Sequence, residues 1–109
     1  MKVTQDNIAD AILSLRGSSV LAVDTETTGL SETDKAFAVI IANAFGVYYF
    51  DERVVPNVFA ELRVLFATTP ARLVFQNTKF DIRMLESVGI IPHSVSDWYD
   101  LTSMARIVR

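Results

Sequence analysis

The chain has 109 residues, which is enough for one domain at most. Half of the residues are apolar, which supports a hydrophobic core and argues against disorder. The apolar runs are far shorter than the roughly 18–20 residues of a membrane span, and the N-terminus lacks the apolar core of a signal peptide. The absence of cysteine excludes disulfides and thiolate metal sites, and it is compatible with the cytosol. We expect a soluble, cytoplasmic protein without a membrane partner.

The charge balance restricts how the chain could bind nucleic acid. Its net charge is −3, with 13 acidic residues against 10 basic ones. A protein that holds nucleic acid by neutralising phosphates is normally basic. If this chain binds nucleic acid, another source of positive charge is needed. Divalent metal ions held by its carboxylates would supply that charge.

The N-terminal segment predicts a helix followed by a strand. Apolar residues recur at helical spacing from Thr4 to Leu15, with Thr4 as the expected N-cap and Gly17 as the stop. Residues 19–25 form a short apolar run rich in Val and Leu, which predicts a strand. Residues 29–34 predict the turn or loop that follows.

The next segment predicts a β-hairpin. Residues 36–44 are continuously apolar, as in a buried strand, and residues 45–50 are its expected partner. Asn43 and Gly46 mark the turn region between the two strands.

The second half alternates helices and strands. Pro56 suits the first turn of a helix whose apolar face follows it. Residues 73–75 predict a short strand, and a helix is expected over about 79–88, ending at Gly89. Asp100 is the expected N-cap of a last helix.

This order of elements predicts an α/β fold, a mixed sheet flanked by helices. The last helix would have an apolar face but few following elements to bury it. We therefore expect residues 1–109 to form a single, C-terminally incomplete domain, either cut or one piece of something larger.

Two acidic residues interrupt the apolar strand in VLAVDTETTGL, residues 20–30. Side chains alternate along a strand, so Asp24 and Glu26 share one face while Thr25 points to the other. Neighbouring carboxylates repel, and a bound Mg²⁺ or Mn²⁺ removes the conflict because hard cations prefer oxygen ligands. The strand end is therefore a candidate metal site. The alternative is a solvated strand end with two ordinary surface acids.

A second polar cluster follows the next apolar strand, in VFQNTKFD, residues 74–81. Asn77 and Asp81 are four residues apart, so they lie on one helix face, one turn apart. An aspartate near a helix N-terminus also has a local explanation, because it complements the positive end of the helix dipole. That explanation does not account for an acidic strand end and an acidic helix start that each follow an apolar strand.

These stretches carry a family resemblance. VLAVDTETTGL resembles the first motif of the DEDD superfamily of 3′–5′ exonucleases, with Asp24 and Glu26 in the metal-binding positions. FQNTKFDIRMLESVGI is similar to the second motif, Asn-x-x-x-Asp in a hydrophobic frame, which would make Asp81 the third metal-site acid. WYDLTSMARIV resembles the segment that follows in the proofreading domain of family A, polymerase I-like DNA polymerases, particularly phage ones. The resemblance runs from about residue 18 to 109 in the family's order.

The resemblance implies an RNase H-like fold that uses two divalent metal ions, Mg²⁺ or Mn²⁺, to hydrolyse a terminal phosphodiester. It implies that Asp24, Glu26 and Asp81 are the catalytic and metal-binding residues, with Asp81 acting through water.

The resemblance also implies substrate contacts and partners. Thr27 and Leu30 match positions that contact the terminal nucleotide, and Asn77 would orient the substrate or the helix start. For Leu30, an ordinary loop-anchoring role is the alternative. The implied partners are the 3′ end of single-stranded DNA and the polymerase remainder or a complementing subunit, in a bacterial or phage-infected host cell.

The family pattern includes a fourth acid, in a third motif of the form Tyr-x-x-x-Asp or His-x-x-x-Asp that also supplies the residue positioning the attacking water. No tyrosine here is followed by aspartate at the fourth position, and the one literal match is His93 to Asp97. That match follows the second motif too closely and sits after Pro92 in a turn-like stretch, so a loop histidine is the better interpretation. We expect this chain alone to be a weak nuclease or none.

Two other functions remain open at the level of sequence. One is a non-catalytic, exonuclease-like module that binds a polymerase partner or single-stranded DNA. The other is a DEDD exoribonuclease, because the contact to a 2′-hydroxyl cannot be located from sequence. The similarity of the final segment to polymerase relatives favours DNA.

Overall fold

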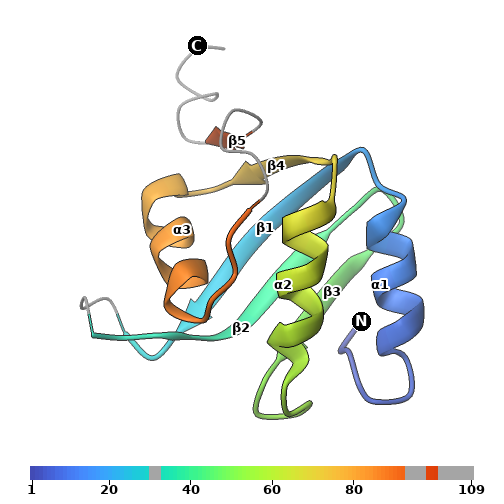
Figure 1. Cartoon of the computed structure of the whole chain (residues 1–109), viewed down its shortest axis with the longest axis horizontal. Coiled ribbons are helices and arrows are strands. Elements are labelled where there is room, and N and C mark those ends of the chain that lie inside the picture. Colours follow the sequence, from blue (N-terminus) through green and yellow to red (C-terminus); the bar gives the residue numbers. More distant parts are fainter. Residues whose placement is uncertain (30–32, 93–97, 101–109) are drawn as a thin grey trace.

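The computed structural model describes residues 1–29, 33–92 and 98–100. In this part of the chain, helices lie on one side of a five-stranded sheet (Figure 1). The elements in chain order are α1 (Ile8–Arg16), β1 (Val20–Thr27), β2 (Ala36–Ala42), β3 (Val47–Asp51), α2 (Val58–Thr68), β4 (Arg72–Phe75), α3 (Thr78–Ser87) and β5 (Trp98–Asp100).

The sheet is mixed, as the order of elements predicts. Its strand order is β3-β2-β1-β4-β5. The pairs β1–β2 and β2–β3 are antiparallel, whereas β1–β4 and β4–β5 are parallel. This arrangement places β1 at the centre, with the hairpin on one side and the parallel strands on the other. The predicted α/β, RNase H-like architecture is confirmed.

Strand β5 was not predicted. The sequence indicated a loop here and then a helix beginning at Asp100, but residues 98–100 pair with β4, and Asp100 lies opposite Phe75. Without a neighbouring strand, the edge of β4 would have backbone N–H and C=O groups that make no hydrogen bond. The backbone of residues 98–100 pairs with these groups, and this pairing does not require an alternating side-chain pattern. The helix expected after Asp100 lies outside the described residues.

Two helix starts differ from the prediction. Helix α1 begins at Ile8 with Asn7 at the N-cap position, because residues 4–7 form a preceding turn in which the Thr4 amide donates to Asn7 Oδ1 at 2.7 Å. Helix α2 begins at Val58, so Pro56 precedes the helix instead of occupying its first turn. The expected stops after α1 and α3 agree with the structure.

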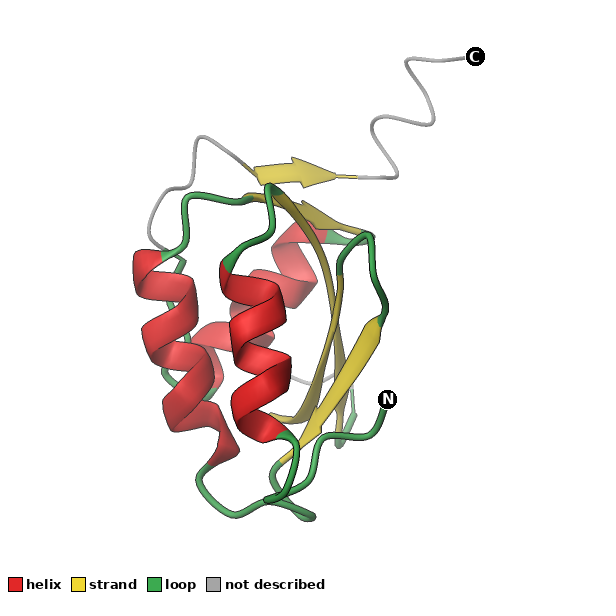
Figure 2. Cartoon of the chain, turned by 90° about the vertical axis from the view of Figure 1, so that its right-hand side faces the viewer, coloured by secondary structure: helices red, strands yellow, loops and turns green. Residues whose placement is uncertain are grey.

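The helices cover one face of the sheet and form the core with it (Figure 2). Strand β1 alternates between buried and exposed side chains along its length, which is the period of a strand with one covered face. The core-facing residues of the strands include Leu21, Val23, Val39, Ile41, Phe50 and Phe75. Among the helices of the described ranges, none has the length and apolar character needed to cross a membrane.

The opposite face of the sheet carries no helix within the described residues (Figure 2). Ala22, Asp24, Ile40, Ala42 and Val74 help to line a shallow depression on this open face. Among the described residues, the first acidic motif therefore lies on the sheet face that carries no helix, next to apolar side chains.

Candidate active site

Asp24 and Glu26 stand on the open face near the C-terminal end of β1. Both are exposed, and they lie opposite Ile40 and Ala38 of β2, respectively. Asp24 Oδ1 accepts a hydrogen bond from the backbone N–H of Thr25 at 2.8 Å. The predicted alternation is confirmed: the two carboxylates share one face, and the buried Thr25 side chain points to the other.

Asp81 lies on the helix-covered face. Its side chain is 2% exposed, and Oδ1 accepts a hydrogen bond from Thr25 Oγ1 at 3.0 Å. Its Oδ2 lies 3.4 Å from the backbone N of Asn77, and its backbone N–H donates to Asn77 O at 2.9 Å. The carboxylate therefore ties the first turn of α3 to the strand residue between the two acids of β1.

In this structure Asp81 contacts the β1 residue that lies between Asp24 and Glu26. Helix α3 packs on the covered face, so Asp81 meets the β1 residue that points toward that face. Within residues 1–29, 33–92 and 98–100, no group of three His, Cys, Asp or Glu side chains is placed to hold a metal ion. The role of Asp81 as a metal ligand stays a prediction.

Tyr49 is a neighbour of the two acids that the sequence motifs do not include. Its hydroxyl donates a hydrogen bond to Glu26 Oε2. This bond, together with burial and the negative charges of Glu26 and Asp51, raises the pKa of Tyr49 to about 12. In the sequence, Tyr49 is followed at the fourth position by Arg53 and not by aspartate, so the third-motif pattern does not single it out. The period of two separates Tyr49 from Tyr48 and Phe50, but only the register of the β1–β2 and β2–β3 pairs places it on the same face as Asp24 and Glu26.

A second charged contact lies at the end of β3. Arg53 binds both carboxylate oxygens of Asp51, with Nε–Oδ1 at 3.1 Å and Nη2–Oδ2 at 2.8 Å. The guanidinium also lies 3.9 Å from the centre of the Phe37 ring. The Arg53 guanidinium holds the pKa of the Asp51 carboxyl below its usual value. This contact secures the end of the strand that carries Tyr49.

The predicted substrate-contacting residues are placed only in part. Thr27 ends β1, is half-buried, and donates from Oγ1 to Gly29 O at 2.7 Å. Asn77 is exposed at the N-cap position of α3. Leu30, His93 and Asp97 lie outside the described residues. The nucleotide-contacting roles stay predictions.

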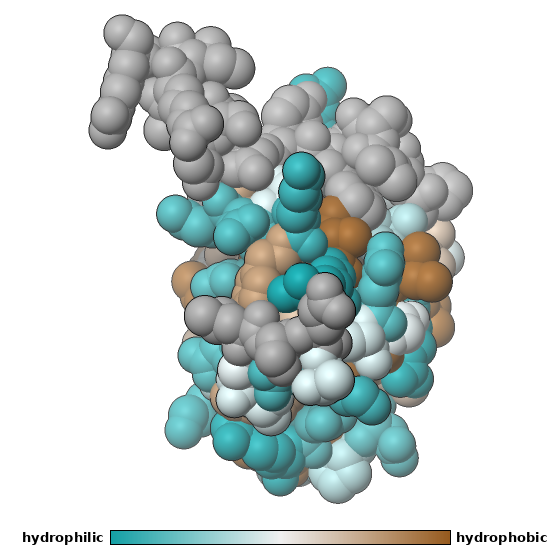
Figure 3. All heavy atoms as spheres, turned by 90° about the vertical axis from the view of Figure 1, so that its left-hand side faces the viewer, coloured by the Kyte–Doolittle hydropathy of each residue, from teal (hydrophilic) through white to brown (hydrophobic). Residues whose placement is uncertain are grey.

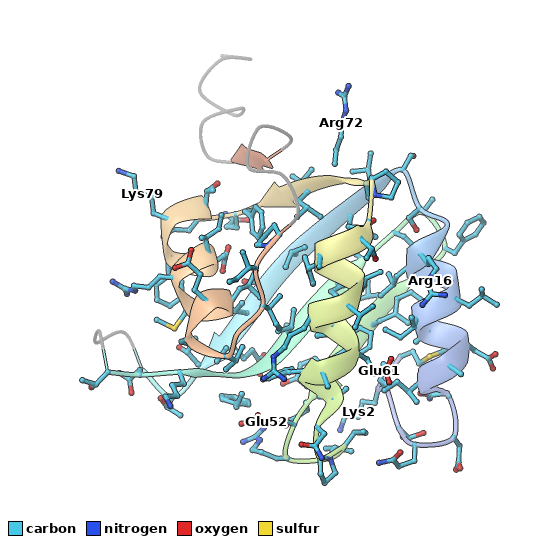
Figure 4. All side chains as sticks on the ribbon, viewed as in Figure 1. Lys2, Arg16, Glu52, Glu61, Arg72 and Lys79 are labelled. Carbon is cyan, nitrogen blue, oxygen red and sulfur yellow. The ribbon has the colours of Figure 1, made fainter. Side chains whose placement is uncertain are left out.

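The exposed surface of α3 includes two basic side chains, Lys79 and Arg83. The side of the molecule that carries α3 is largely hydrophilic, with small apolar areas between polar groups (Figure 3). Lys79, on the first turn of α3, points away from the sheet (Figure 4). The donor set on β1 is two exposed carboxylates one residue apart, which fits a hard divalent cation better than it fits a phosphate.

Comparisons with known proteins agree with the sequence motifs. A profile of the 3′–5′ exonuclease family, of the DNA polymerase A type, matches residues 2–108. Among curated proteins, none matches the chain significantly.

Solved structures share the fold. The Nibbler EXO domain from Aedes aegypti has a TM-score of 0.74 at 21% identity, over 98% of this chain and 55% of that one. Trypanosoma brucei RNase D complexed with RNA U12 has a TM-score of 0.75 at 23% identity, over 93% of this chain and 37% of that one. The Pol1 POL domain from M. smegmatis, complexed with DNA primer-template and dNTP, has a TM-score of 0.76 at 20% identity, over 100% of this chain and 19% of that one.

These identities support a shared fold and nothing finer, and the chain spans about half or less of the length of these relatives. The profile match is what decides the family, because it covers nearly the whole sequence and includes both acidic motifs in order. The chain belongs to the 3′–5′ exonuclease family, DNA polymerase A type.

Proposed function

We propose that residues 1–109 form the N-terminal part of a 3′–5′ exonuclease domain that acts in DNA proofreading, and that this part alone is a weak nuclease or none. The single observation that carries the proposal is the arrangement around β1. Asp24 and Glu26 stand side by side on an exposed face, and the second motif is anchored to the residue between them by the Thr25–Asp81 hydrogen bond.

Asp24 and Glu26 would hold Mg²⁺ or Mn²⁺, since their carboxylate oxygens are the donors that such ions prefer. A bound metal ion would supply activation of water and stabilisation of charge on the scissile phosphate. The chain's own residues hold the ligands in place. Strand β1 fixes the spacing of the two carboxylates, and its central position in the sheet keeps that spacing rigid.

Asp81 is assigned as the third acid of the site by its motif. In the structure its carboxylate contacts Thr25 on the covered face. To bind the same metal ion as Asp24 and Glu26, Asp81 would need a different side-chain position or a bridging water molecule. The weak activity that we propose follows from this separation and from the lack of a matching third motif in the sequence. Thr27 is the last residue of β1, and Asn77 is the N-cap residue of α3. A 3′-terminal nucleotide would lie beside these two residues.

Metal binding is the first test. Mn²⁺ binding to the chain is measured by electron paramagnetic resonance, in the wild type and in Asp24→Asn, Glu26→Gln and Glu86→Gln. Glu86 is an exposed acid at the far end of α3 and serves as the matched control. We expect binding that is lost in the first two variants and retained in the third. Absence of binding, or equal binding in all variants, refutes the metal site.

Nuclease activity is the second test. A single-stranded DNA and an RNA of the same sequence, each with a 5′ fluorophore, are incubated with Mn²⁺, with Mg²⁺ or with EDTA and resolved on denaturing gels. We expect little or no shortening by this chain alone, with any shortening starting at the 3′ end. Fast shortening that Asp24→Ala abolishes would contradict the proposed weakness, and preference for the RNA would favour an exoribonuclease over a proofreading enzyme.

A second candidate function is a non-catalytic module that binds single-stranded DNA or a polymerase partner. The observation that favours it is the burial of Asp81 against Thr25, away from the two exposed acids. Binding of labelled single-stranded DNA that is unchanged by EDTA and by Asp24→Asn would support this candidate over the enzymatic one.

A further inference from the structure

The hydroxyl of Tyr49 reaches Glu26 across an intervening strand. Tyr49 lies on β3 and Glu26 on β1, with β2 between them. Two strand spacings amount to about 9–10 Å, so the bond forms only because both side chains are long and lean toward each other over the open face. The β2 residue opposite Glu26 is Ala38, which is fully buried although it belongs to the face without a helix. A larger residue at that position would obstruct the bridge.

Tyr49 itself is fixed on both sides. On one side it pairs with Ile40 of β2. On the other side, its N–H donates to Met1 O at 2.9 Å, and its carbonyl accepts from Val3 N at 3.0 Å. The N-terminal segment, in which Lys2 is labelled in Figure 4, therefore runs alongside β3 and covers its outer edge. The backbone that carries the tyrosine has little freedom to move.

The consequence falls on the Glu26 side chain. An exposed glutamate on a strand end samples many rotamers, and each must be given up when the carboxylate binds a cation. The tyrosine selects one orientation by holding Oε2, and it leaves Oε1 for a cation on the same face as Asp24. Residues that orient a ligand through its second oxygen are a common means of tuning metal affinity.

We propose that Tyr49 is a positioning residue of the nuclease site, which fixes the Glu26 carboxylate for metal binding through its hydroxyl. This proposal rests on the proposed function, since it assigns Glu26 as a ligand. The tyrosine acts through Glu26 and is not itself placed at the reacting atoms.

The neighbouring tyrosine provides a matched control. Tyr48 points into the covered face, where its hydroxyl donates to Ser14 Oγ at 2.9 Å. Tyr48→Phe and Tyr49→Phe each remove a single hydroxyl from adjacent residues of one strand, and each keeps the ring. A general effect of losing a hydroxyl from β3 would appear in both variants, whereas an effect on the site would appear in Tyr49→Phe alone.

The experiment is a titration with Mn²⁺, followed by electron paramagnetic resonance, of the wild type, Tyr48→Phe, Tyr49→Phe, Glu26→Gln and the double variant Glu26→Gln/Tyr49→Phe. We expect Tyr49→Phe to weaken Mn²⁺ binding ~10-fold, the lower end of the range for residues that orient a metal ligand. Tyr48→Phe is expected to bind as the wild type does. In the Glu26→Gln background, removal of the Tyr49 hydroxyl should have no further effect.

The outcomes separate the two claims. Unchanged Mn²⁺ affinity in Tyr49→Phe, with binding lost in Asp24→Asn, overturns the role of Tyr49 and leaves the metal site standing. An equal loss in Tyr48→Phe and Tyr49→Phe also overturns it, because the effect would then be structural. No Mn²⁺ binding by the wild type refutes the proposed function, and the role of Tyr49 falls with it.

Discussion

The hydrogen bond between Thr25 and Asp81 is the contact that joins the two acidic motifs, and its contribution can be worked out from the structure. The bond is 3.0 Å long and buried, and its acceptor is a carboxylate. A hydrogen bond to a charged group is worth about 1.5–3 kcal/mol, and a buried carboxylate that loses one of its donors pays a desolvation cost of similar size. Thr25→Val keeps the shape of the side chain but removes the donor. We therefore expect it to lower the free energy of unfolding by about 1.5–3 kcal/mol.

A double-mutant cycle isolates this bond. In an Asp81→Ala background the acceptor is gone, so Thr25→Val should be neutral or slightly stabilising, because valine suits a buried strand position. The coupling energy between the two sites should then be about 1.5–3 kcal/mol. Urea unfolding followed by far-ultraviolet circular dichroism gives the four free energies.

Thr27→Val is the control for this cycle. Thr27 lies on the same strand, and its hydroxyl donates to Gly29 O and not to α3. The changes that Thr27→Val and Asp81→Ala make in the free energy of unfolding should therefore be additive within about 0.5 kcal/mol. A Thr25–Asp81 coupling below about 0.5 kcal/mol would refute the reasoning, since the bond would then contribute no more than a solvent-exposed one.

Three further predictions concern stability. Phe66 is fully buried in the core, so Phe66→Ala should lower the free energy of unfolding by about 3–5 kcal/mol in urea, and a smaller loss would mean that the core closes around the gap. Gly89 has a positive φ of 78°, and a Cβ added there would meet the Arg63 side chain, so Gly89→Ala should lower the free energy of unfolding by about 1 kcal/mol or more. At Gly17 an added Cβ would meet no other atom, so Gly17→Ala should leave the free energy of unfolding unchanged or raise it by about 0.4–1 kcal/mol. Arg53 lowers the folded-state pKa of Asp51 from 3.8, so this contribution to stability is present above pH 3.8 and lost as pH falls toward the lowered value. Urea midpoints between pH 7 and pH 3 should show a shallower acid loss in Arg53→Gln, and an unchanged profile would contradict this assignment.

The parts of the fold that sequence predicts well are those set by local chemistry. The apolar run of β1 and its period of two identify the strand and the common face of Asp24 and Glu26. The turn between β2 and β3 follows from Asn43, whose N–H donates to Gly46 O at 3.0 Å and whose Oδ1 accepts from the Phe45 and Gly46 amides at 2.9 and 3.0 Å. These contacts span a few residues, so their signals lie in a few letters.

The parts that sequence does not predict depend on contacts between distant segments. Strand β5 pairs with the edge of β4, and three residues are too short a run for the strand preference of Trp98 and Tyr99 to distinguish a strand from a loop. The side of the sheet on which α3 packs decides which β1 residue Asp81 meets, and helical periodicity gives no information on that choice. Tyr49 and Glu26 are 23 residues apart, and their contact requires the register of two strand pairs, β1–β2 and β2–β3.

The alternation of β1 gives the site its organisation. Consecutive residues of the strand face opposite sides, so Thr25 is held by Asp81 of α3 and Glu26 by Tyr49 of β3. A shift of the β1 register by one residue would exchange the two faces and break both contacts at once. The strand is therefore fixed from both sides at the point where its carboxylates would bind a cation. Loss of the bond on the covered face should chiefly lower stability, whereas loss of the bond on the open face should chiefly lower metal affinity. Measuring both quantities for Thr25→Val and Tyr49→Phe separates the roles of the two contacts, which hold the adjacent β1 residues Thr25 and Glu26.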